Sequence, residues 1–212
     1  MKKEDAIRII TNCANDYHTY LENQNLLFLF GDSKNANFFE ASFLPRHFLH
    51  LTGVKVKSEN TSGSSNFYNR ALDRRLSPDD FSFSANGTTE MKLLVLPQLM
   101  RIHISAKMIG EYNESKSVLH TDKLAGGISA CLGFVQENGY YIPNTVLKED
   151  IRNVSKNSTQ RVLAIFRKQS THSLYAEVCY LAKGITFDGI KIAPSIKEKI
   201  DFTAVALPPL QH

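Results

Sequence analysis

The sequence lacks tryptophan, long apolar runs and paired cysteines, and these absences exclude several classes of protein. No apolar run approaches the roughly 18 residues that a membrane-spanning helix needs, so we expect no membrane contact. The thiols of Cys13, Cys131 and Cys179 are odd in number and widely spaced, which argues against a disulfide framework and a cysteine zinc site. We therefore expect buried, reduced thiols and a cytoplasmic protein. Acids follow the N-terminal lysines within the first helical turns, so we expect no signal peptide.

Motifs for common cofactors are missing as well. The chain contains no Walker loop, no Gly-x-Gly-x-x-Gly and no Gly-x-Ser-x-Gly nucleophile elbow. Its adjacent carboxylate pairs, at positions 79–80 and 149–150, diverge on either a strand or a helix. No His-x-x-x-His pair or carboxylate cluster has the spacing of metal ligands. We therefore expect no cofactor and no metal site. Zinc held by His47 and His50 with distant ligands is the alternative.

Positive charge is concentrated in two stretches of a chain whose net charge is only +4. Residues 46–75 contain six lysines or arginines against two acids, and residues 148–168 again contain six against two. Each stretch carries +4, so the rest of the chain sums to −4. Two basic stretches on an otherwise acidic protein favour binding of a polyanion, although charge runs are usually just solvated surface.

The first half of the chain is mostly helical in pattern. Apolar residues at three- and four-residue spacing predict an amphipathic helix over residues 3–23. We treat residues 1–24 as this helical segment and residues 25–212 as a single α+β domain. Further elements are expected as strands at 26–30 and 37–44, a short helix from Pro45 to Gly53, a polar loop at 58–65, and helices at 65–76 and 88–103, the last interrupted by Pro97.

The second half changes to strand-like alternation separated by turn signals. Strands are expected at residues 107–112, 118–124, 129–135, 161–168 and 175–181, followed by a helical turn at 195–200. Helices first and an antiparallel sheet later is the α+β pattern. The sequence thus predicts N-terminal helices packed on a four- to five-stranded antiparallel sheet.

Stretches spread over most of residues 20–185 carry a resemblance to a known family: FLPRHFLHLTG (43–53), NFYNRALDRRLSPDDF (66–81), EMKLLVLPQLM (90–100), HTDKLAGG (120–127), LGFVQENGYYIPNTVLKEDI (132–151), RVLAIFRK (161–168) and YAEVCYLAK (175–183). Their order resembles a phage-associated family of BECR-type nucleases, the group named for barnase, EndoU, colicin-type tRNases and RelE. Fold alone does not dictate activity, so the residues are considered separately.

The resemblance implies helices packed on a four-stranded antiparallel sheet, one face of which holds RNA. It also implies cleavage without a metal ion, in which the 2′-hydroxyl attacks the adjacent phosphorus and leaves a cyclic phosphate and a free 5′-hydroxyl. Such chemistry needs a base for the 2′-hydroxyl, an acid for the leaving oxygen, and cations or amide donors for the phosphorane. RNA is the implied substrate because DNA lacks that hydroxyl.

The segment after Pro45 places two histidines and an arginine within one or two helical turns. Histidine changes its charge near neutral pH, so a pair beside a fixed cation suits phosphodiester chemistry. His50 is the first candidate for proton transfer, and packing on the helix is its alternative. His47 is the second candidate, or else a surface or phosphate-contacting residue. Arg46 could bind phosphate or lie along the surface, and Thr52 could donate a hydroxyl to phosphate or cap the turn.

Lys123 is the second candidate for catalysis. Alternation along the predicted strand places Thr121 and Lys123 on one face, and Asp122 with Leu124 on the other. A lysine on the sheet face stabilises phosphorane charge as a point cation. The alternative is an edge-strand lysine that deters aggregation. Thr121 is assigned to RNA binding with it.

A third group follows the proline at position 143 and opens the next strand. Asn144 and Thr145 could hydrogen-bond phosphate or a base edge, or could simply form a polar turn. Arg161 is a candidate bidentate phosphate ligand, with a surface salt bridge as its alternative. Tyr175 could stack on a base, although aromatic residues in such strands are more often core.

Together these observations predict a metal-independent endoribonuclease of phage or mobile-element origin, acting in a bacterial host cell as a toxin, an anti-defence factor or a processing enzyme. Its RNA would be structured or guide-type, and tRNA is included. The alternative is a catalytically inert protein that binds RNA or a host ribonucleoprotein as an anti-CRISPR-like inhibitor. Steep salt dependence without product formation would favour that alternative.

Overall fold

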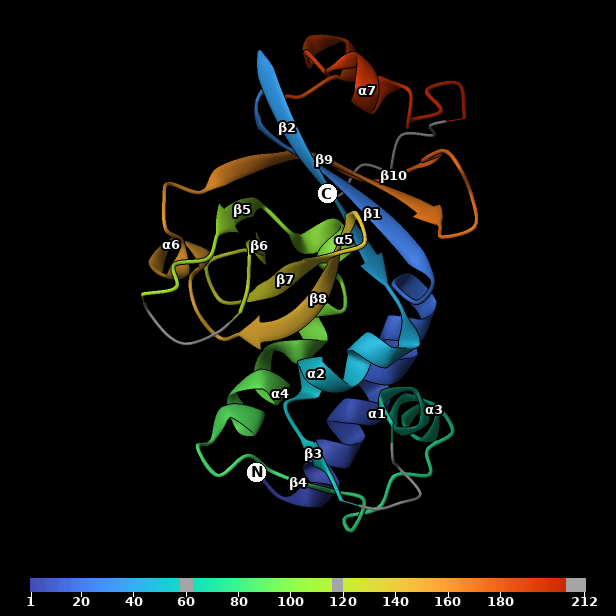
Figure 1. Cartoon of the computed structure of the whole chain (residues 1–212), viewed down its shortest axis with the longest axis vertical. Helices are drawn as coiled ribbons and strands as arrows, with labels where there is room; N and C mark the ends of the chain where they lie inside the picture. The colour runs from blue at the N-terminus through green and yellow to red at the C-terminus, as the bar shows by residue number, and fades with distance from the viewer. Residues whose placement is uncertain (58–62, 116–119, 205–212) are drawn as a thin grey trace.

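An eight-stranded sheet that closes on itself forms the centre of the molecule (Figure 1). The computed structural model describes residues 1–57, 63–115 and 120–204. The strands of the sheet are β1 (Gln24–Asp32), β2 (Asn35–Phe43), β5 (Met108–Glu111), β6 (Lys123–Gly126), β7 (Cys131–Glu137), β8 (Tyr140–Leu147), β9 (Gln160–Gln169) and β10 (Glu177–Leu181).

The order of strands is β1-β2-β8-β7-β6-β5-β9-β10, and a further pairing between β1 and β9 closes seven of them into a ring. The long hairpin of β1 and β2 pairs Gln24 with Phe43 at one end and Asp32 with Asn35 at the other. The paired strands are antiparallel except at the junction of β2 with β8, which consists of one parallel bridge between Ala41 and Tyr141. β10 extends the sheet beyond the ring, on the edge of β9.

The expected four- to five-stranded sheet was too small, although the α+β class is confirmed. Five strands expected in the second half do join one sheet, but β1 and β2 from the first half join the same sheet. The remaining strand, β8, was missed because Pro143 interrupts its pattern, and a proline argues against a central strand. The structure accommodates Pro143 beside a bulge, where the register with β7 shifts between Gly133 and Phe134.

Helices cover one face of the ring and one of its ends (Figure 1). They are α1 (Lys3–Tyr20), the 3-10 turn η1 (Pro45–His47), α2 (Phe48–Thr52), α3 (Ser64–Leu72), α4 (Thr88–Leu99) and α5 (Ile102–Ser105), and the short strands β3 (Lys55–Val56) and β4 (Phe81–Ser82) pair beside them. The expected helix at 88–103 ends at Leu99 and restarts at Ile102, whereas Pro97 lies within α4. Parts of the loop expected at 58–65 and of the strand expected at 118–124 lie outside the described residues.

The main core lies between these helices and the sheet, and α1 belongs to it. Tyr17 of α1 is fully buried, with its ring 5.4 Å from that of Phe48 and 5.6 Å from that of Tyr68. Its hydroxyl donates a hydrogen bond of 2.9 Å to the Leu44 carbonyl, so the buried polar atom is satisfied. This contact ties the N-terminal helix to the segment that carries the predicted histidines.

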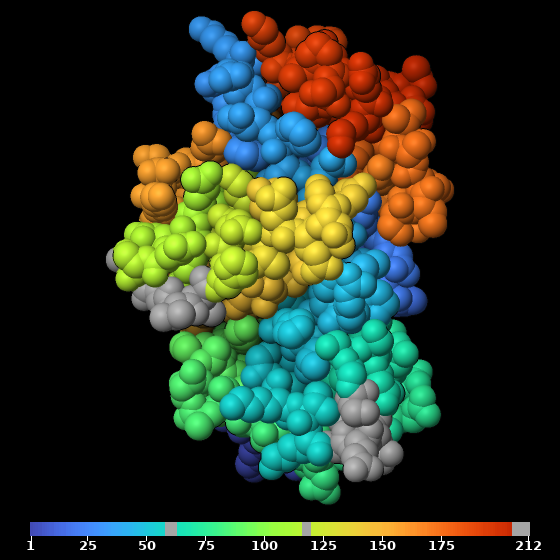
Figure 2. All heavy atoms as spheres, viewed as in Figure 1, coloured from blue at the N-terminus to red at the C-terminus, as the bar shows by residue number. Residues whose placement is uncertain are grey.

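Shorter segments cover the other face of the sheet, and the last of them form the top of the molecule, in red in Figure 2. The 3-10 turn η3 (Phe187–Gly189) and α7 (Pro194–Lys197) pack over β1, β9 and β10, with Ile190, Ile192 and Ile196 inward. The single-turn helix α6 (Ile151–Val154) covers β5 and β6 through Ile151. Much of the sheet is therefore covered on both faces, and solvent-accessible side chains of the ring remain at its end. Within the described residues, no helix combines the length and apolar character needed to cross a bilayer.

Candidate active site

The end of the ring away from α1 opens into two adjoining hollows, which together we call the mouth. Their volumes are about 510 and 340 Å³. Every strand of the ring contributes to the lining: Phe30 from β1, Asn37 and Phe38 from β2, Glu111 from β5, Lys123 from β6, Gln136 from β7, Tyr141 from β8 and Gln160 from β9. Glu111 and Lys123 line both hollows and therefore stand at their junction.

Strand alternation explains why polar residues gather at the mouth. Side chains two residues apart on a strand point to the same face. On four strands a core residue is followed, two positions nearer the mouth, by a polar residue. The core residues are Phe39, Ile109, Ala125 and Val162, and the corresponding polar residues are Asn37, Glu111, Lys123 and Gln160. On each of these four strands, the side chains that face the core therefore end in one polar side chain at the mouth.

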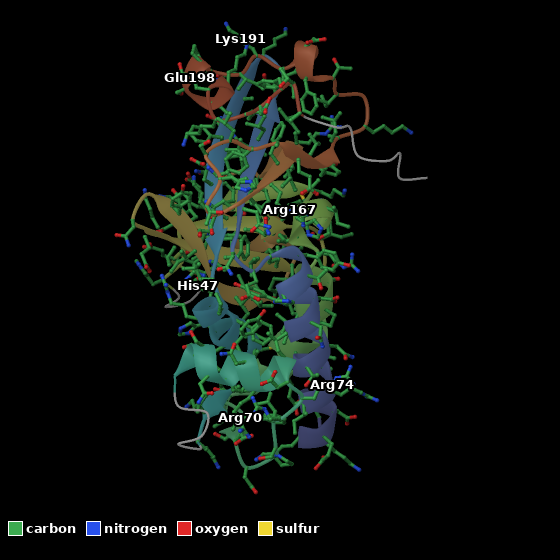
Figure 3. The ribbon with its side chains drawn as sticks, turned by 90° about the vertical axis from the view of Figure 1, so that its right-hand side faces the viewer. His47, Arg70, Arg74, Arg167, Lys191 and Glu198 are labelled. Carbon is green, nitrogen blue, oxygen red and sulfur yellow. The ribbon has the colours of Figure 1, made fainter. Side chains whose placement is uncertain are left out.

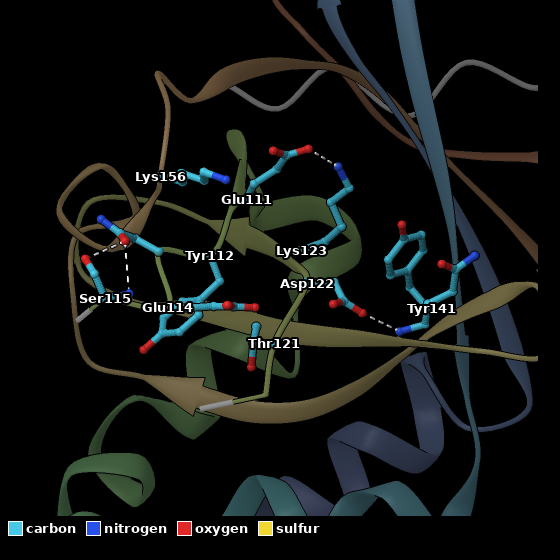
Figure 4. A pocket seen from close by; sticks show the side chains of 11 residues that line it. Glu111, Tyr112, Glu114, Ser115, Thr121, Asp122, Lys123, Tyr141 and Lys156 are labelled. Carbon is cyan, nitrogen blue, oxygen red and sulfur yellow. Dashed lines mark hydrogen bonds and ion pairs between the residues drawn. The ribbon is translucent and has the colours of Figure 1, made fainter. Parts of the chain in front are cut away.

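Lys123 and Glu111 form an ion pair at the junction of the hollows (Figure 4). They are direct partners in the register of β5 with β6, and Nζ of Lys123 lies 2.7 Å from Oε1 of Glu111. The Lys123 side chain is 21% exposed, so a ligand in either hollow can reach it. The hydrogen bond and positive charge of Lys123, with a smaller effect from Lys156, hold the pKa of Glu111 below its usual value.

Three other predicted residues lie together beside Lys123. Thr121 and Thr145 are buried, and Thr121 lines the larger hollow. The hydroxyl of Thr121 lies 3.5 Å from Oδ1 of Asn144, whose Nδ2 donates a 2.6 Å hydrogen bond to the carbonyl of His120. Both threonine methyl groups pack over Gly133, where an added Cβ would meet them at 2.7 and 2.9 Å. In this cluster the Thr121 hydroxyl and the Asn144 amide hold each other and the start of β6 in place.

Asp122 faces away from Lys123 along the strand and closes the larger hollow from the side (Figure 4). Its Oδ2 accepts a 2.8 Å hydrogen bond from the backbone N–H of Gln136 on β7. Tyr141 stands opposite, half-buried, with its ring 5.3 Å from that of Phe39 in an edge-to-face contact. The larger hollow is therefore walled by fixed polar groups and by two tyrosines, Tyr112 and Tyr141.

The histidine pair lies outside the mouth lining. His47 is buried between the helical layer and the sheet (Figure 3), and its Nδ1 accepts a 3.2 Å hydrogen bond from the backbone N–H of Leu44. Burial, reinforced by the charges of Arg46 and then His50, lowers the pKa of His47 to about 4. His47 is therefore neutral at physiological pH, which suits a structural role better than proton transfer. His50 is exposed on α2, where its backbone carbonyl accepts a 3.1 Å hydrogen bond from Lys92.

The other residues of that segment are engaged within the protein. Arg46 forms an exposed ion pair of 3.3 Å with Glu137 at the end of β7. Thr52 is fully buried, and its hydroxyl donates a 2.7 Å hydrogen bond to the carbonyl of Leu49. In this arrangement the Thr52 hydroxyl caps the turn and does not reach an external phosphate.

Arg161 and Tyr175 are also placed away from the mouth. Arg161 is adjacent to Gln160 on β9 and points to the opposite face, where its guanidinium donates a 2.8 Å hydrogen bond to the carbonyl of Lys183. Tyr175 is fully buried, and its hydroxyl donates a 2.9 Å hydrogen bond to Oε1 of Glu40. A ring without exposed surface cannot stack on a base, so the predicted stacking by Tyr175 is not possible in this arrangement.

The two basic stretches do not form one surface. Arg70 and Arg74 lie at the helical end of the molecule, whereas Arg167 lies near its middle and is paired with Glu177 (Figure 3). Of the twelve cations counted in the two stretches, all of them among the described residues, Lys156 is the one that lines the mouth. Pairing within the sheet, and not the clustering of charge along the chain, therefore builds the site.

Sequence reasoning missed Glu111. The signal was present, because Ile109 in the segment Met108–Glu111 is a core residue and strand alternation puts Glu111 on the same face. An isolated acid on a short strand is ordinarily solvated surface, so only its pairing with Lys123 distinguishes it. Across the three described ranges, no group of three or more histidine, cysteine or acidic side chains is placed to hold a metal ion.

Comparison with known proteins places most of the chain in one family. The family model described as phage-Barnase-EndoU-ColicinE5/D-RelE like nuclease4 matches residues 9–184. The match includes every strand of the ring and the whole lining of the mouth, and it ends before η3 and α7. Searches of curated proteins and of solved structures give no match.

Proposed function

Because the chain belongs to the phage-Barnase-EndoU-ColicinE5/D-RelE like nuclease4 family, we propose that it is a metal-independent endoribonuclease whose active site is the mouth of the closed sheet. The observation that carries this proposal is the position of Lys123, at the junction of two hollows each large enough for a nucleotide. An RNA strand crossing the mouth would place one phosphate at Lys123 and a nucleotide on either side.

Lys123 is the cation of the proposed reaction. Attack by the 2′-oxygen on phosphorus gives a phosphorane whose equatorial oxygens carry the developing negative charge, and the Lys123 ammonium lies where it can stabilise them. Its ion pair with Glu111 is partly exposed, and such pairs contribute only about 0–1 kcal/mol. A phosphate can therefore displace Glu111 from Lys123 at little cost.

Glu111 is the proposed base for the 2′-hydroxyl. Once phosphate occupies Lys123, the carboxylate loses its counter-ion and faces a second negative charge, and both changes raise its pKa toward the range of an effective base. The 2′-hydroxyl proton passes to Glu111 as the 2′-oxygen bonds to phosphorus. The bond from phosphorus to the 5′-oxygen breaks. That oxygen takes a proton from the ammonium of Lys156, which lines the larger hollow together with Glu111. The products are a cyclic phosphate and a free 5′-hydroxyl.

His50 remains the second acid–base candidate because it is exposed and the Arg46–Glu137 ion pair ties its neighbourhood to the end of β7. Phage or mobile-element origin, action in the bacterial cytoplasm and a toxin, anti-defence or RNA-processing role belong to the same proposal. The family name and the ribonuclease chemistry support them.

Incubation of the purified protein with a labelled RNA pool in EDTA tests the proposal. We expect cleavage with cyclic-phosphate ends, and Lys123→Ala should lower the rate roughly 10²- to 10³-fold, as for loss of one transition-state donor. Lys197→Ala removes an exposed lysine from α7 and is the matched control. Comparison of Glu111→Gln with His50→Ala identifies the base, because the residue that serves as base gives the larger loss.

Two results would overturn the proposal. The first is intact RNA bound in a strongly salt-dependent manner, which would indicate the inert RNA- or ribonucleoprotein-binding protein instead. The second is cleavage that Lys123→Ala leaves as fast as in the unmodified protein, which would place the active site elsewhere.

A further inference from the structure

The two hollows of the mouth differ in chemistry, and the smaller one has the character of a base-binding site. The larger hollow contains the carboxylates of Glu114 and Asp122 and the cation Lys156. Among the residues that the structure describes, the smaller hollow is lined by no charged side chain besides the shared Lys123 and Glu111. Its remaining polar lining is dominated by the amides of Asn37, Asn157 and Gln160, and its apolar lining includes two phenylalanines.

We propose that the smaller hollow holds the base next to the phosphate at Lys123 and recognises adenine through these three amides. The inference rests on the proposed function, because it assumes that a phosphate of an RNA strand binds at Lys123. It goes beyond that function by assigning residues that select where the strand is cut.

The amides are available for recognition. Asn37, Asn157 and Gln160 come from β2, from the segment before β9 and from the first position of β9, so three separate parts of the chain converge. All three residues are exposed, and within the described ranges none of their side-chain amides makes a hydrogen bond to the protein. A carboxamide can donate to N7 of adenine and accept from its N6 amino group at once, which makes Asn and Gln its usual partners.

The floor of the smaller hollow is apolar. Phe30 is the direct partner of Asn37 in the β1–β2 hairpin and shares its face, and Ile109 lies on the same side of β5 as Glu111. Phe38 points to the opposite face of β2, where its partner is the core residue Leu29 and its ring centroid lies 5.9 Å from Nζ of Lys199. A base in the hollow would rest on the apolar floor while the three unengaged amides read its edge.

Binding of short RNA that cannot be cut tests this inference separately from catalysis. The full chain is titrated with 2′-O-methyl trinucleotides that carry adenine, guanine, cytosine, uracil or no base at the position next to the central phosphate. We expect adenine to bind tightest, and Gln160→Ala to reduce its advantage roughly 5- to 100-fold, the range for one bidentate contact. Asn37→Ala should reduce the same advantage, whereas Phe38→Ala, whose ring lies on the opposite face of β2, should leave binding of every trinucleotide unchanged.

Asn69→Ala removes an exposed amide from α3 and is the control matched to Gln160→Ala and Asn37→Ala. It should bind all trinucleotides as the unmodified protein does. Equal affinity for the abasic and adenine-containing trinucleotides, or unchanged discrimination in both Gln160→Ala and Asn37→Ala, would overturn the base site. Because these trinucleotides lack the attacking hydroxyl, failure to cleave RNA would count against the proposed function alone.

Discussion

Lowering the pH from 7 to 5 is expected to destabilise the fold through two histidines that are buried in their neutral form. His47 and His103 are 3% and 5% exposed. Burial, followed for His103 by the charges of Arg167 and Arg101, lowers the pKa of each histidine to about 4. In the unfolded chain the same side chains have a pKa of about 6.5.

The direction follows from proton binding. Between pH 6.5 and 4 the unfolded state holds a proton on each histidine and the folded state does not, so stability falls as pH falls. Above pH 6.5 both histidines are neutral in the folded and the unfolded state, so the full free energy of unfolding is retained. At pH 5 each histidine lowers the free energy of unfolding by about 2 kcal/mol, and the pair lowers it by about 4 kcal/mol. That is a large share of the roughly 5–15 kcal/mol that stabilises a typical domain.

Urea unfolding followed by circular dichroism at pH 5, 6, 7 and 8 measures this loss. The ring of His103 stacks on that of Tyr20, with 5.2 Å between the ring centroids. His103→Phe keeps an aromatic ring in this place and should remove about half of the pH dependence. His47→Phe should remove the other half, but it leaves the N–H of Leu44 without its acceptor and costs about 1–3 kcal/mol at every pH. The exposed His172 provides the control, since His172→Phe should leave the profile unchanged.

The reasoning would be refuted by a free energy of unfolding that is constant between pH 8 and 5, or by a double variant that keeps the full dependence. Carboxylates with lowered pKa values, such as Asp80 and Glu111, lose stabilisation at more acidic pH. Restricting the measurements to pH 5 and above therefore isolates the histidines.

Three further substitutions test the assignments made at buried positions. Tyr175→Phe removes the hydroxyl bonded to Glu40 and should cost about 1.5–3 kcal/mol in urea unfolding while leaving RNA affinity unchanged. Thr52→Val should cost about 1 kcal/mol without changing the cleavage rate, and Thr52→Ser should restore the stability. Gly126→Ala should cost about 1–3 kcal/mol or more, because its Cβ would meet a backbone oxygen at 2.4 Å, whereas Gly127→Ala meets nothing within 4 Å and should be tolerated.

Local pattern was enough to predict most elements of the fold. The periodicity of residues 3–23, the apolar run at 26–30 and the strand patterns at 129–135 and 161–168 correspond to α1, β1, β7 and β9. These patterns indicate which side of one element is buried, and that side is the same whichever element packs against it. The number of strands in the sheet could not be read in this way, because the pairing of Leu26 with Arg167 joins distant parts of the chain.

The same distinction applies to the candidate site. Thr121 and Lys123 were predicted from strand alternation and Thr145 from its position after Pro143, and the structure brings them together. The histidine pair was favoured because its members are close in sequence, yet His47 is turned into the core and His50 onto the surface of α2. Proximity along a helix does not specify which side chain faces a cleft, whereas alternation along a strand does so once one core residue is known.

The weak junction between β2 and β8 explains why the mouth is open where it is. β8 begins at Tyr140, directly after the turn at residues 138–139, and meets β2 at a single parallel bridge between Ala41 and Tyr141. In this parallel register the residues opposite Asn35–Phe39 would precede Tyr140, where the chain turns back from β7 and offers no strand to pair with. The first half of β2, from Asn35 to Phe39, therefore pairs with β1 alone among the described strands. An unpaired strand edge leaves its side chains accessible from one side. The turn that precedes β8 is thus what leaves Asn37 free to line the smaller hollow.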